Sequence, residues 1–156
     1  MEQDDTITRD QAMLVSTFWL GDAVFGVDTA RVQEVVRVGD ITAVRGAAPY
    51  VLGIMNLRGR IATVIDLALK LGIPRAEMDA SSRIFIADWR SEPVGLVVDR
   101  VADVIEMDRA DLSPPPENLR GVKGQHLMGV SQAGGRLTAL LDLEAVLASE
   151  TGEMSA

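Results

Sequence analysis

The chain repeats part of its own sequence, and this repeat constrains the fold more than any other feature. Residues 53–71 and 129–147 align at an offset of 76, with shared glycines, an arginine, an aspartate and leucines. Residues 25–36 and 94–105 form a second pair of similar blocks at an offset of 69. The alternative is coincidence among apolar strands, but two blocks in the same order argue against it. A period this long predicts a duplicated small domain rather than a solenoid.

The first copy of the longer block has the pattern of a β-hairpin followed by a short helix. Ile54–Leu57 and Ile61–Ile65 are apolar and rich in β-branched residues, which suit strands. Arg58 and Gly59 lie between them, and glycine adopts the positive φ that a two-residue hairpin turn needs. Asp66 follows the second strand and precedes spaced leucines, so we expect it to cap a short helix.

The whole chain reads as mainly β. Turn signals recur about every eight to twelve residues between short apolar runs, as in small barrels or sandwiches. We predict two five-stranded β-barrel subdomains related by internal duplication, with short helices, over residues 12–75 and 82–148 of one domain. One continuous sandwich is the alternative, and a terminal strand or helix can cross between the lobes. We expect flexible tails at residues 1–11 and 149–156.

Composition argues against several classes of function. The sequence has no cysteine, and its single histidine, His126, is interpreted as a loop residue rather than a metal ligand. A net charge of −8 and an aromatic content of 4% disfavour nucleic acid as a partner. The first residues are acidic, unlike a signal peptide, and no apolar run approaches the ~20 residues of a membrane span. We therefore expect no membrane insertion and a reducing, cytoplasmic setting.

No catalytic or cofactor motif is present. The sequence lacks a phosphate-binding loop, a nucleophile elbow, a zinc-protease motif and a dinucleotide fingerprint. Carboxylates do gather at Asp99, Asp103, Glu106 and Asp108. A small barrel enzyme using them is one hypothesis, but strand alternation predicts an exposed, solvated face instead.

Comparison of the two copies separates residues needed by the fold from residues free for function. Gly59, Arg60 and Asp66 recur in the second copy, so we assign them to the turn, the strand edge and the cap. Arg58 does not recur, because Gly134 takes its place. We therefore predict a binding role for Arg58, whose guanidinium can reach a carboxylate or carbonyl of a partner. By the same test Arg31 with Glu34, and Arg100 with Asp103, are expected to form an ion pair in each lobe.

The order of motifs resembles the CheW coupling proteins of bacterial chemotaxis. The resemblance rests on Asn-Leu-Arg-Gly at 56–59, with Gly53 before it, Asp66-Leu67 after it and Val-Gly-Leu-Val-Val-Asp-Arg-Val at 94–101. A proline run and a closing Leu-Leu-Asp-Leu motif follow. The similarity extends over roughly residues 15–147, nearly the whole chain.

The resemblance implies two intertwined SH3-like barrels without catalytic activity, metal or cofactor. Such proteins are scaffolds that bridge the cytoplasmic tips of methyl-accepting chemoreceptors to the regulatory domain of the histidine kinase CheA. It implies a cytoplasmic protein in receptor arrays, where weak self-association is also possible. A coupling subunit of a non-flagellar pathway and an adaptor for some other helical partner are the alternatives.

The resemblance also assigns contact residues to positions in this chain. The implied receptor-binding positions are Val32, Glu34, Arg58, Val94, Gly95 and Val101. The implied kinase-binding positions are Ile41, Val44, Leu52, Gly53, Pro114 and Pro116. Leu52 is apolar where a charge could stand, and Ser113 and Asn118 flank the prolines where stronger contact residues could lie.

Overall fold

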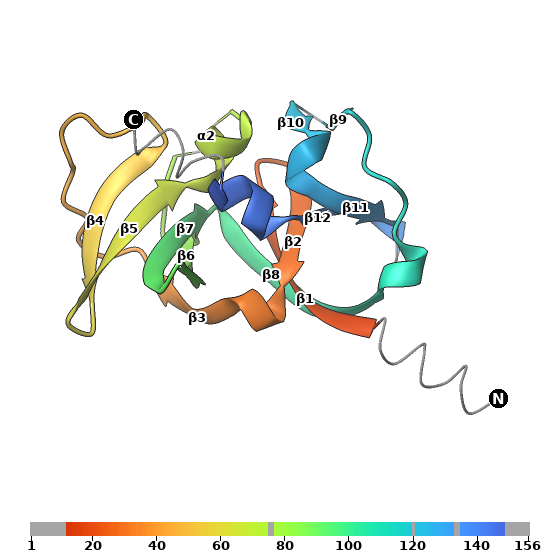
Figure 1. Cartoon of the computed structure of the whole chain (residues 1–156), viewed down its shortest axis with the longest axis horizontal. Coiled ribbons are helices and arrows are strands. Elements are labelled where there is room, and N and C mark those ends of the chain that lie inside the picture. Colours follow the sequence, from red (N-terminus) through yellow and green to blue (C-terminus); the bar gives the residue numbers. More distant parts are fainter. Residues whose placement is uncertain (1–11, 75–76, 120, 133–134, 149–156) are drawn as a thin grey trace.

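The structure is a computed structural model that describes residues 12–74, 77–119, 121–132 and 135–148. The predicted flexible tails lie outside these ranges. The chain forms two groups of strands side by side, with β3–β7 in one group and β1, β2, β8, β11 and β12 in the other (Figure 1). Within the described residues, no helix has the length and apolar character needed to cross a membrane.

Strands dominate the secondary structure. The strands of the first half are β1 (Ala12–Leu20), β2 (Ala23–Asp28), β3 (Val32–Arg37), β4 (Val51–Leu57) and β5 (Arg60–Asp66). Those of the second half are β6 (Arg83–Trp89), β7 (Glu92–Val98), β8 (Arg100–Asp108), β9 (Asn118–Leu119), β10 (Val122–Lys123), β11 (Leu127–Ser131) and β12 (Thr138–Leu141). The short helices are α2 (Leu67–Leu71), the 3-10 turns η1 (Thr29–Arg31), η2 (Arg109–Asp111) and η3 (Gly124–His126), and a helical run at 143–148.

The strands form two five-stranded sheets, which confirms the mainly β prediction. One sheet has the order β3-β6-β7-β5-β4 and the other β11-β12-β2-β1-β8. The sheets do not follow the consecutive ranges 12–75 and 82–148, because each sheet combines strands from both ranges. The β1–β2 hairpin of the first half joins β8, β11 and β12, and the β6–β7 hairpin of the second half joins β3, β4 and β5.

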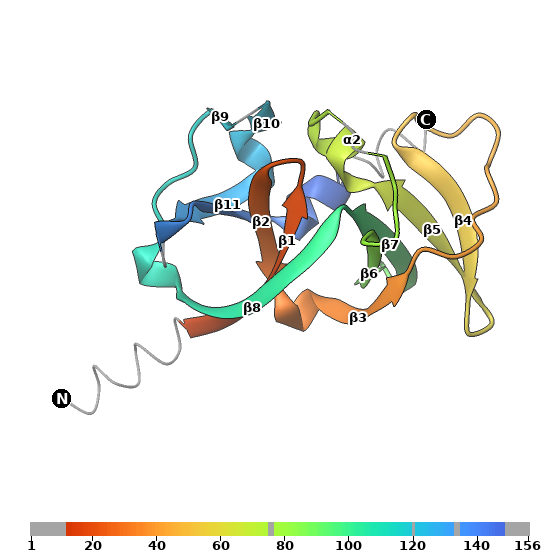
Figure 2. The same cartoon turned by 180° about the vertical axis from the view of Figure 1, so that it is seen from behind.

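The connections between strands explain this exchange. Only Asp99 separates β7 from β8. One residue is too short to reverse the chain into a hairpin, which needs at least two. Strand β8 therefore leaves the sheet of β7 and pairs with β1 in the other sheet (Figure 2). The turn η1, capped by Asp28, makes the equivalent passage from β2 to β3.

The duplication is visible in matching close contacts at two glycines. A Cβ on Gly26 would lie 2.4 Å from the Val15 side chain, and a Cβ on Gly95 would lie 2.7 Å from the Ile84 side chain. Each glycine thus lets a strand of its own hairpin pack closely. Both sheets also contain one parallel pair, β12 with β2 and β5 with β7. The two halves therefore repeat one topology and exchange their first hairpins.

The largest core lies between the two sheets. Phe18 and Phe25 come from one sheet and Phe85 from the other, with the rings of Phe18 and Phe85 centred 5.2 Å apart. Two smaller clusters use the opposite faces of the strands. One is formed by Met13, Val15, Met107 and Leu140, and the other by Val64, Ile84, Ile86 and Val97. Central strands are buried on both faces, which explains their nearly continuous apolar sequences.

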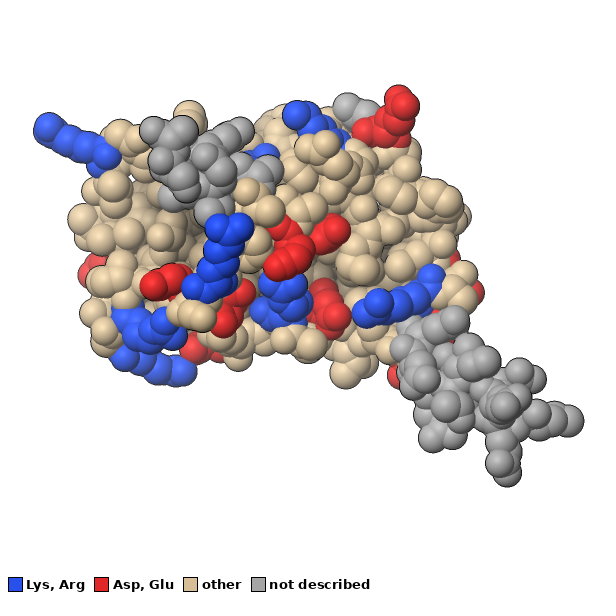
Figure 3. All heavy atoms as spheres, viewed as in Figure 1, with Lys and Arg blue, Asp and Glu red and all other residues tan. Residues whose placement is uncertain are grey.

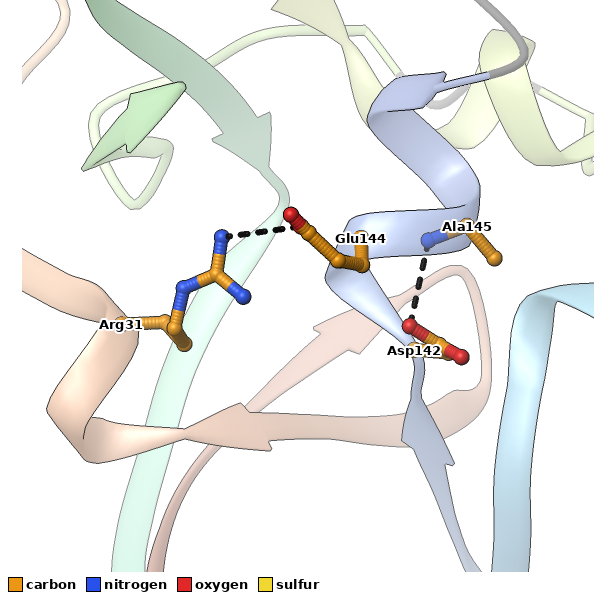
Figure 4. A network of polar contacts seen from close by, with 4 residues as sticks. All are labelled: Arg31, Asp142, Glu144 and Ala145. Atoms are coloured by element: carbon orange, nitrogen blue, oxygen red, sulfur yellow. Dashed lines mark hydrogen bonds and ion pairs between the residues drawn. The ribbon is translucent and has the colours of Figure 1, made fainter. Parts of the chain in front are cut away.

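Both copies of the helical block are capped as predicted. The Asp66 carboxylate accepts a hydrogen bond from the backbone N–H of Leu69 at 3.3 Å, and Gly72 ends α2 in the left-handed conformation. Asp142 caps the closing helix in the same way, through the N–H of Ala145 at 3.1 Å (Figure 4). The repeated aspartates therefore serve the fold.

The predicted ion pair within each lobe is wrong. Arg31 lies 3.9 Å from Glu144 on the closing helix instead (Figure 4), and Arg100 stacks over the ring of Trp19 at 4.9 Å. Glu34 pairs with Arg58. The exchange of hairpins brings Arg31 beside a helix from the other half.

Two loop predictions also change. The expected strand at residues 41–44 is reduced to one bridge between Thr42 and Ile54. The expected loop at 117–126 contains the small β9–β10 hairpin and η3. His126 ends η3, directly before β11, and is buried, with 7% of its surface exposed.

Candidate binding surfaces

Arg58 lies at the tip of the β4–β5 hairpin in a turn with two left-handed residues. Its φ is 51° and that of Gly59 is 85°, so the turn has the backbone twist that two-residue hairpins favour. The side-chain oxygen of Asn56 accepts a hydrogen bond from the N–H of Gly59 at 2.9 Å. The Asn-Leu-Arg-Gly motif therefore closes its own turn.

Arg58 and Glu34 form an ion pair with an N–O distance of 2.8 Å. Glu34 lies on β3, one edge of its sheet, and Arg58 lies beside β4, the other edge. The pair thus connects the two edges across the open side of the sheet. The Arg58 side chain is 78% exposed and that of Glu34 23% exposed, so the guanidinium remains accessible to another protein.

The conformation of Arg58 does not favour stability. A left-handed backbone costs a residue with a Cβ about 1 kcal/mol or more relative to glycine. Exposed ion pairs typically stabilise by only about 0–1 kcal/mol, which at most offsets this cost. Glycine at this position would make an equally good turn, so stability does not explain the arginine.

Three of the other predicted receptor positions lie in the same sheet. The register of β3, β6 and β7 places Val32 and Val94 in one row and Glu34 and Gly95 in the next. Val94 is 7% exposed and Gly95 is buried, with no space for a Cβ. These two residues are buried and can affect the surface only by supporting the residues above them. Val32 is half-buried and therefore partly accessible to solvent.

Val101 belongs to the other sheet. It lies on β8, is 41% exposed and pairs with Phe18. The structure therefore brings together five of the six predicted receptor positions on one sheet and leaves Val101 on its neighbour.

Sequence reasoning missed exposed apolar residues beside these positions. Val35 on β3 is 42% exposed and Ile61 on β5 is 55% exposed. Burial alternates along β3, so the period-two pattern could have identified Val35 as a surface residue. Acidic and basic side chains lie interspersed across the lower half of the face in Figure 3. Apolar positions among mixed charges suit a protein partner.

Four of the predicted kinase positions gather at the β4 edge. The N–H and C=O of Thr42 exchange hydrogen bonds of 2.8 Å with Ile54, which holds the segment of Ile41 and Val44 against β4. Gly53 permits this approach, because a Cβ there would lie 2.1 Å from the Thr42 carbonyl oxygen. Val44 is 45% exposed, whereas Ile41 and Leu52 are half-buried.

Pro114 and Pro116 lie far from that edge. Both are exposed, in the loop between η2 and β9 at the opposite end of the molecule from β4 (Figure 1). The loop is held to β11 by a bridge between Ser113 and Val130. The predicted kinase positions therefore form two separate surfaces.

The carboxylates of Asp99, Asp103, Glu106 and Asp108 are used locally or lie in solvent. Asp99 accepts a hydrogen bond from the N–H of Gly21 at 2.6 Å, and Asp108 caps η2 through Ala110 at 2.9 Å. Asp103 and Glu106 are exposed. Within the ranges that the structure describes, no group of three or more histidines, cysteines or carboxylates could hold a metal ion.

Comparison with known proteins gives a consistent result. The family model of the CheW-like domain matches residues 15–151. A chemotaxis protein CheW of Rhizobium meliloti is 33% identical over 87% of this chain and 88% of its own length. Protein FrzA of Myxococcus xanthus is 33% identical over 79% of this chain and 76% of its own length.

A solved structure of a CheW protein also matches this chain. The crystal structure of the scaffolding protein TtCheW from Thermoanaerobacter tengcongensis matches with a TM-score of 0.79 and 30% identity, covering 86% of each chain. The family match, the relatives and the fold agree over nearly the whole sequence, and the chain belongs to the family of CheW-like domains.

Proposed function

We propose that this chain is a chemotaxis adaptor, which couples methyl-accepting chemoreceptors to the histidine kinase CheA and catalyses no reaction itself. Membership of the CheW-like family over residues 15–151 carries this proposal. The carboxylates that could have suggested catalysis have structural uses instead, since Asp99 accepts a hydrogen bond from the N–H of Gly21 and Asp108 caps η2. The proposed location is the cytoplasm, beside receptor arrays.

The receptor surface is proposed to lie around the Arg58–Glu34 pair. A receptor tip is a helical hairpin, and helices bind to apolar grooves with polar edges. Val32, Val35 and Val101 offer apolar contacts, and the exposed guanidinium of Arg58 can orient the partner. Arginine is suited to this role because its planar donors bind carboxylates and carbonyls in a fixed geometry.

The kinase surface is proposed to lie at the β4 edge, around Ile41, Val44, Leu52 and Gly53, with a second contact at Pro114 and Pro116. The two ends of the molecule would then carry the two kinase contacts. Each contact can be weak, because repetition within an array multiplies the effective affinity.

A three-component kinase assay with variants of Arg58 tests the proposal. The chain is expected to raise autophosphorylation of CheA in the presence of receptor and to turn over no ATP alone. Arg58→Glu should lose most of that activation, because it places a carboxylate beside Glu34 and removes the exposed guanidinium.

Arg90→Glu is the matched control. Arg90 occupies the same position in the β6–β7 turn, with a φ of 52°, but is not among the predicted contacts. It should retain activation, and both variants should unfold at nearly the wild-type temperature. Full activation by folded Arg58→Glu would refute the role of Arg58, and no activation by the wild-type chain would refute the adaptor function.

A further inference from the structure

One pocket contains every tyrosine, histidine and lysine of the sequence. The chain has one tyrosine, Tyr50, one histidine, His126, and two lysines, Lys70 and Lys123; all its other basic side chains are arginines. These four residues line an open pocket of about 340 Å³. The remaining lining residues are Leu69, Leu71, Gly72, Gly121 and Gln125. None of them is a predicted receptor or kinase contact.

The pocket lies where elements from the two halves of the chain meet. Tyr50 precedes β4 and Lys70 lies on α2, whereas Lys123 ends β10 and His126 ends η3. The backbones of Gly72 and Gly121 approach so closely that a Cβ on Gly121 would lie 3.2 Å from the Gly72 carbonyl oxygen. A ligand in the pocket would therefore contact both halves.

Two buried side chains of the pocket lack hydrogen-bond partners. Among the residues that the structure describes, the Tyr50 hydroxyl and both ring nitrogens of His126 are buried without a partner. Tyr50 is 8% exposed and His126 7% exposed. Buried polar groups are nearly always satisfied, and each unsatisfied one costs about 1–3 kcal/mol. Three such atoms beside one pocket indicate a missing polar partner.

The charged side chains around the pocket indicate the charge of that missing partner. The Lys70 ammonium lies 4.7 Å from the centre of the Tyr50 ring, and Lys123 is exposed at the rim. Burial, followed by the charges of Lys70 and Lys123, lowers the pKa of His126, while the nearby Asp142 acts in the opposite direction. The carboxylate of Asp142 is engaged by the N–H of Ala145. The pocket thus combines two cations with neutral donors.

We propose that this pocket binds a small phosphate-bearing anion. Lys70 and Lys123 supply the positive charge, and the Tyr50 hydroxyl and a ring N–H of His126 donate hydrogen bonds. Several donors around one site suit a group with several acceptor oxygens. Lysine, a compact charge on a flexible stem, can turn towards such a ligand, which fits its restriction to this pocket in an arginine-rich chain.

A small molecule fits the pocket better than a side chain of another protein. The unpartnered atoms of Tyr50 and His126 are buried within the pocket lining, where a small ligand can approach more easily than a side chain held on the surface of another protein. The volume of about 340 Å³ exceeds that of inorganic phosphate and leaves space for a small organic group.

Nuclear magnetic resonance of the untagged full chain provides a direct test, because His126 gives the only imidazole signals. Sodium phosphate is titrated at pH 7.5 against sodium chloride of equal ionic strength. We expect a saturable shift of the His126 ring resonances with phosphate alone. Lys123→Met should weaken phosphate binding about tenfold, the size expected for one charge-assisted hydrogen bond. Arg109→Met removes an exposed cation outside the pocket and should change nothing.

The titrations distinguish specific phosphate binding from a general effect of salt. A linear shift, or an equal shift with chloride, would overturn the proposal. Unchanged affinity in Lys123→Met would also overturn it, and this exposed side chain can be replaced without loss of the fold. The result is independent of receptor coupling, because the assay contains neither receptor nor kinase.

Discussion

The position of His126 in the fold could not be predicted from the residues around it in the sequence. The sequence places it before an apolar run, and we predicted a loop residue without any prediction of its burial. In the fold, His126 is buried and lines one pocket with Tyr50 and residues of α2, all of which lie more than fifty residues earlier in the chain. No local pattern encodes that contact. In contrast, the roles of Asp66 and Gly59 were predictable, because a cap and a turn depend on neighbours within a few residues.

The burial of His126 predicts a pH dependence of stability. Its folded pKa is lowered from the ordinary value of about 6.5, which the unfolded chain retains. At a pH between the folded and unfolded pKa values, His126 is protonated more often in the unfolded state than in the folded state. The free energy of unfolding therefore decreases as the pH falls below about 6.5 towards the folded pKa. Above the unfolded pKa this contribution is complete.

Urea unfolding of the wild type and of His126→Gln at pH 8 and pH 5.5 measures the effect. The wild type should lose more stability on acidification than the variant, because the carboxylates titrate in both proteins and only the wild type carries the imidazole. Equal losses in the two proteins, or an NMR titration that gives His126 an ordinary pKa, would contradict this assignment.

Individual strands and hairpins follow closely from local sequence, whereas their partners do not. Runs of β-branched residues and the Arg58-Gly59 turn located β5 to within one residue at each end and β4 to within three. The pairing of β1 with β8 could not be predicted, because the repeated hairpins have similar apolar faces and fit either half. The decisive feature is the single residue between β7 and β8, which is too short for a hairpin turn. It could be recognised only if the ends of both strands were already known.

Gly53 allows the 41–44 segment to pack against β4, and a substitution can test this role. Its φ is 149°, and a Cβ would lie 2.1 Å from the Thr42 carbonyl oxygen. Gly53→Ala should push the 41–44 segment away from β4 and destabilise the fold by about 3 kcal/mol, within the range of overpacked, strained sites. Chemical denaturation measures this loss.

Gly39→Ala is the matched control, because nothing lies within 4 Å of a Cβ at that glycine. It should change the free energy of unfolding by less than about 0.5 kcal/mol, as is usual for unconstrained surface sites. Equal stability of the two variants would contradict the close approach of Thr42 and with it the gathering of the proposed kinase contacts at the β4 edge.

At the scale of the whole molecule, the exchanged hairpins make the two halves depend on each other. Each sheet takes two strands from one half and three from the other, and the main core lies between the sheets. The surfaces around Arg58, at the β4 edge and at Pro114 and Pro116 are therefore held by one cooperative unit. An adaptor that carries partners at separate positions benefits from such a rigid body, because the geometry between its partners is then fixed.

Cutting the chain between the halves tests this dependence. Residues 1–78 contain β1–β5 but only the β1–β2 part of one sheet and the β3–β5 part of the other. We expect this fragment, and the fragment 79–156, to show no cooperative unfolding alone, since neither contains a complete sheet or the full core. Mixed together, each should supply the hairpin that the other lacks and restore a cooperative transition.

The two tryptophans report on this assembly, because Trp19 lies in the first fragment and Trp89 in the second. In the intact fold Arg100 and Arg136, both from the second half, stack over the Trp19 ring at 4.9 and 5.1 Å. Trp19 in the isolated first fragment should therefore emit like a solvated indole, and mixing should shift its emission to that of the whole chain. A first fragment that unfolds cooperatively alone, with native Trp19 emission, would mean that β1 and β2 find a complete sheet within their own half, and the exchange of hairpins would be excluded.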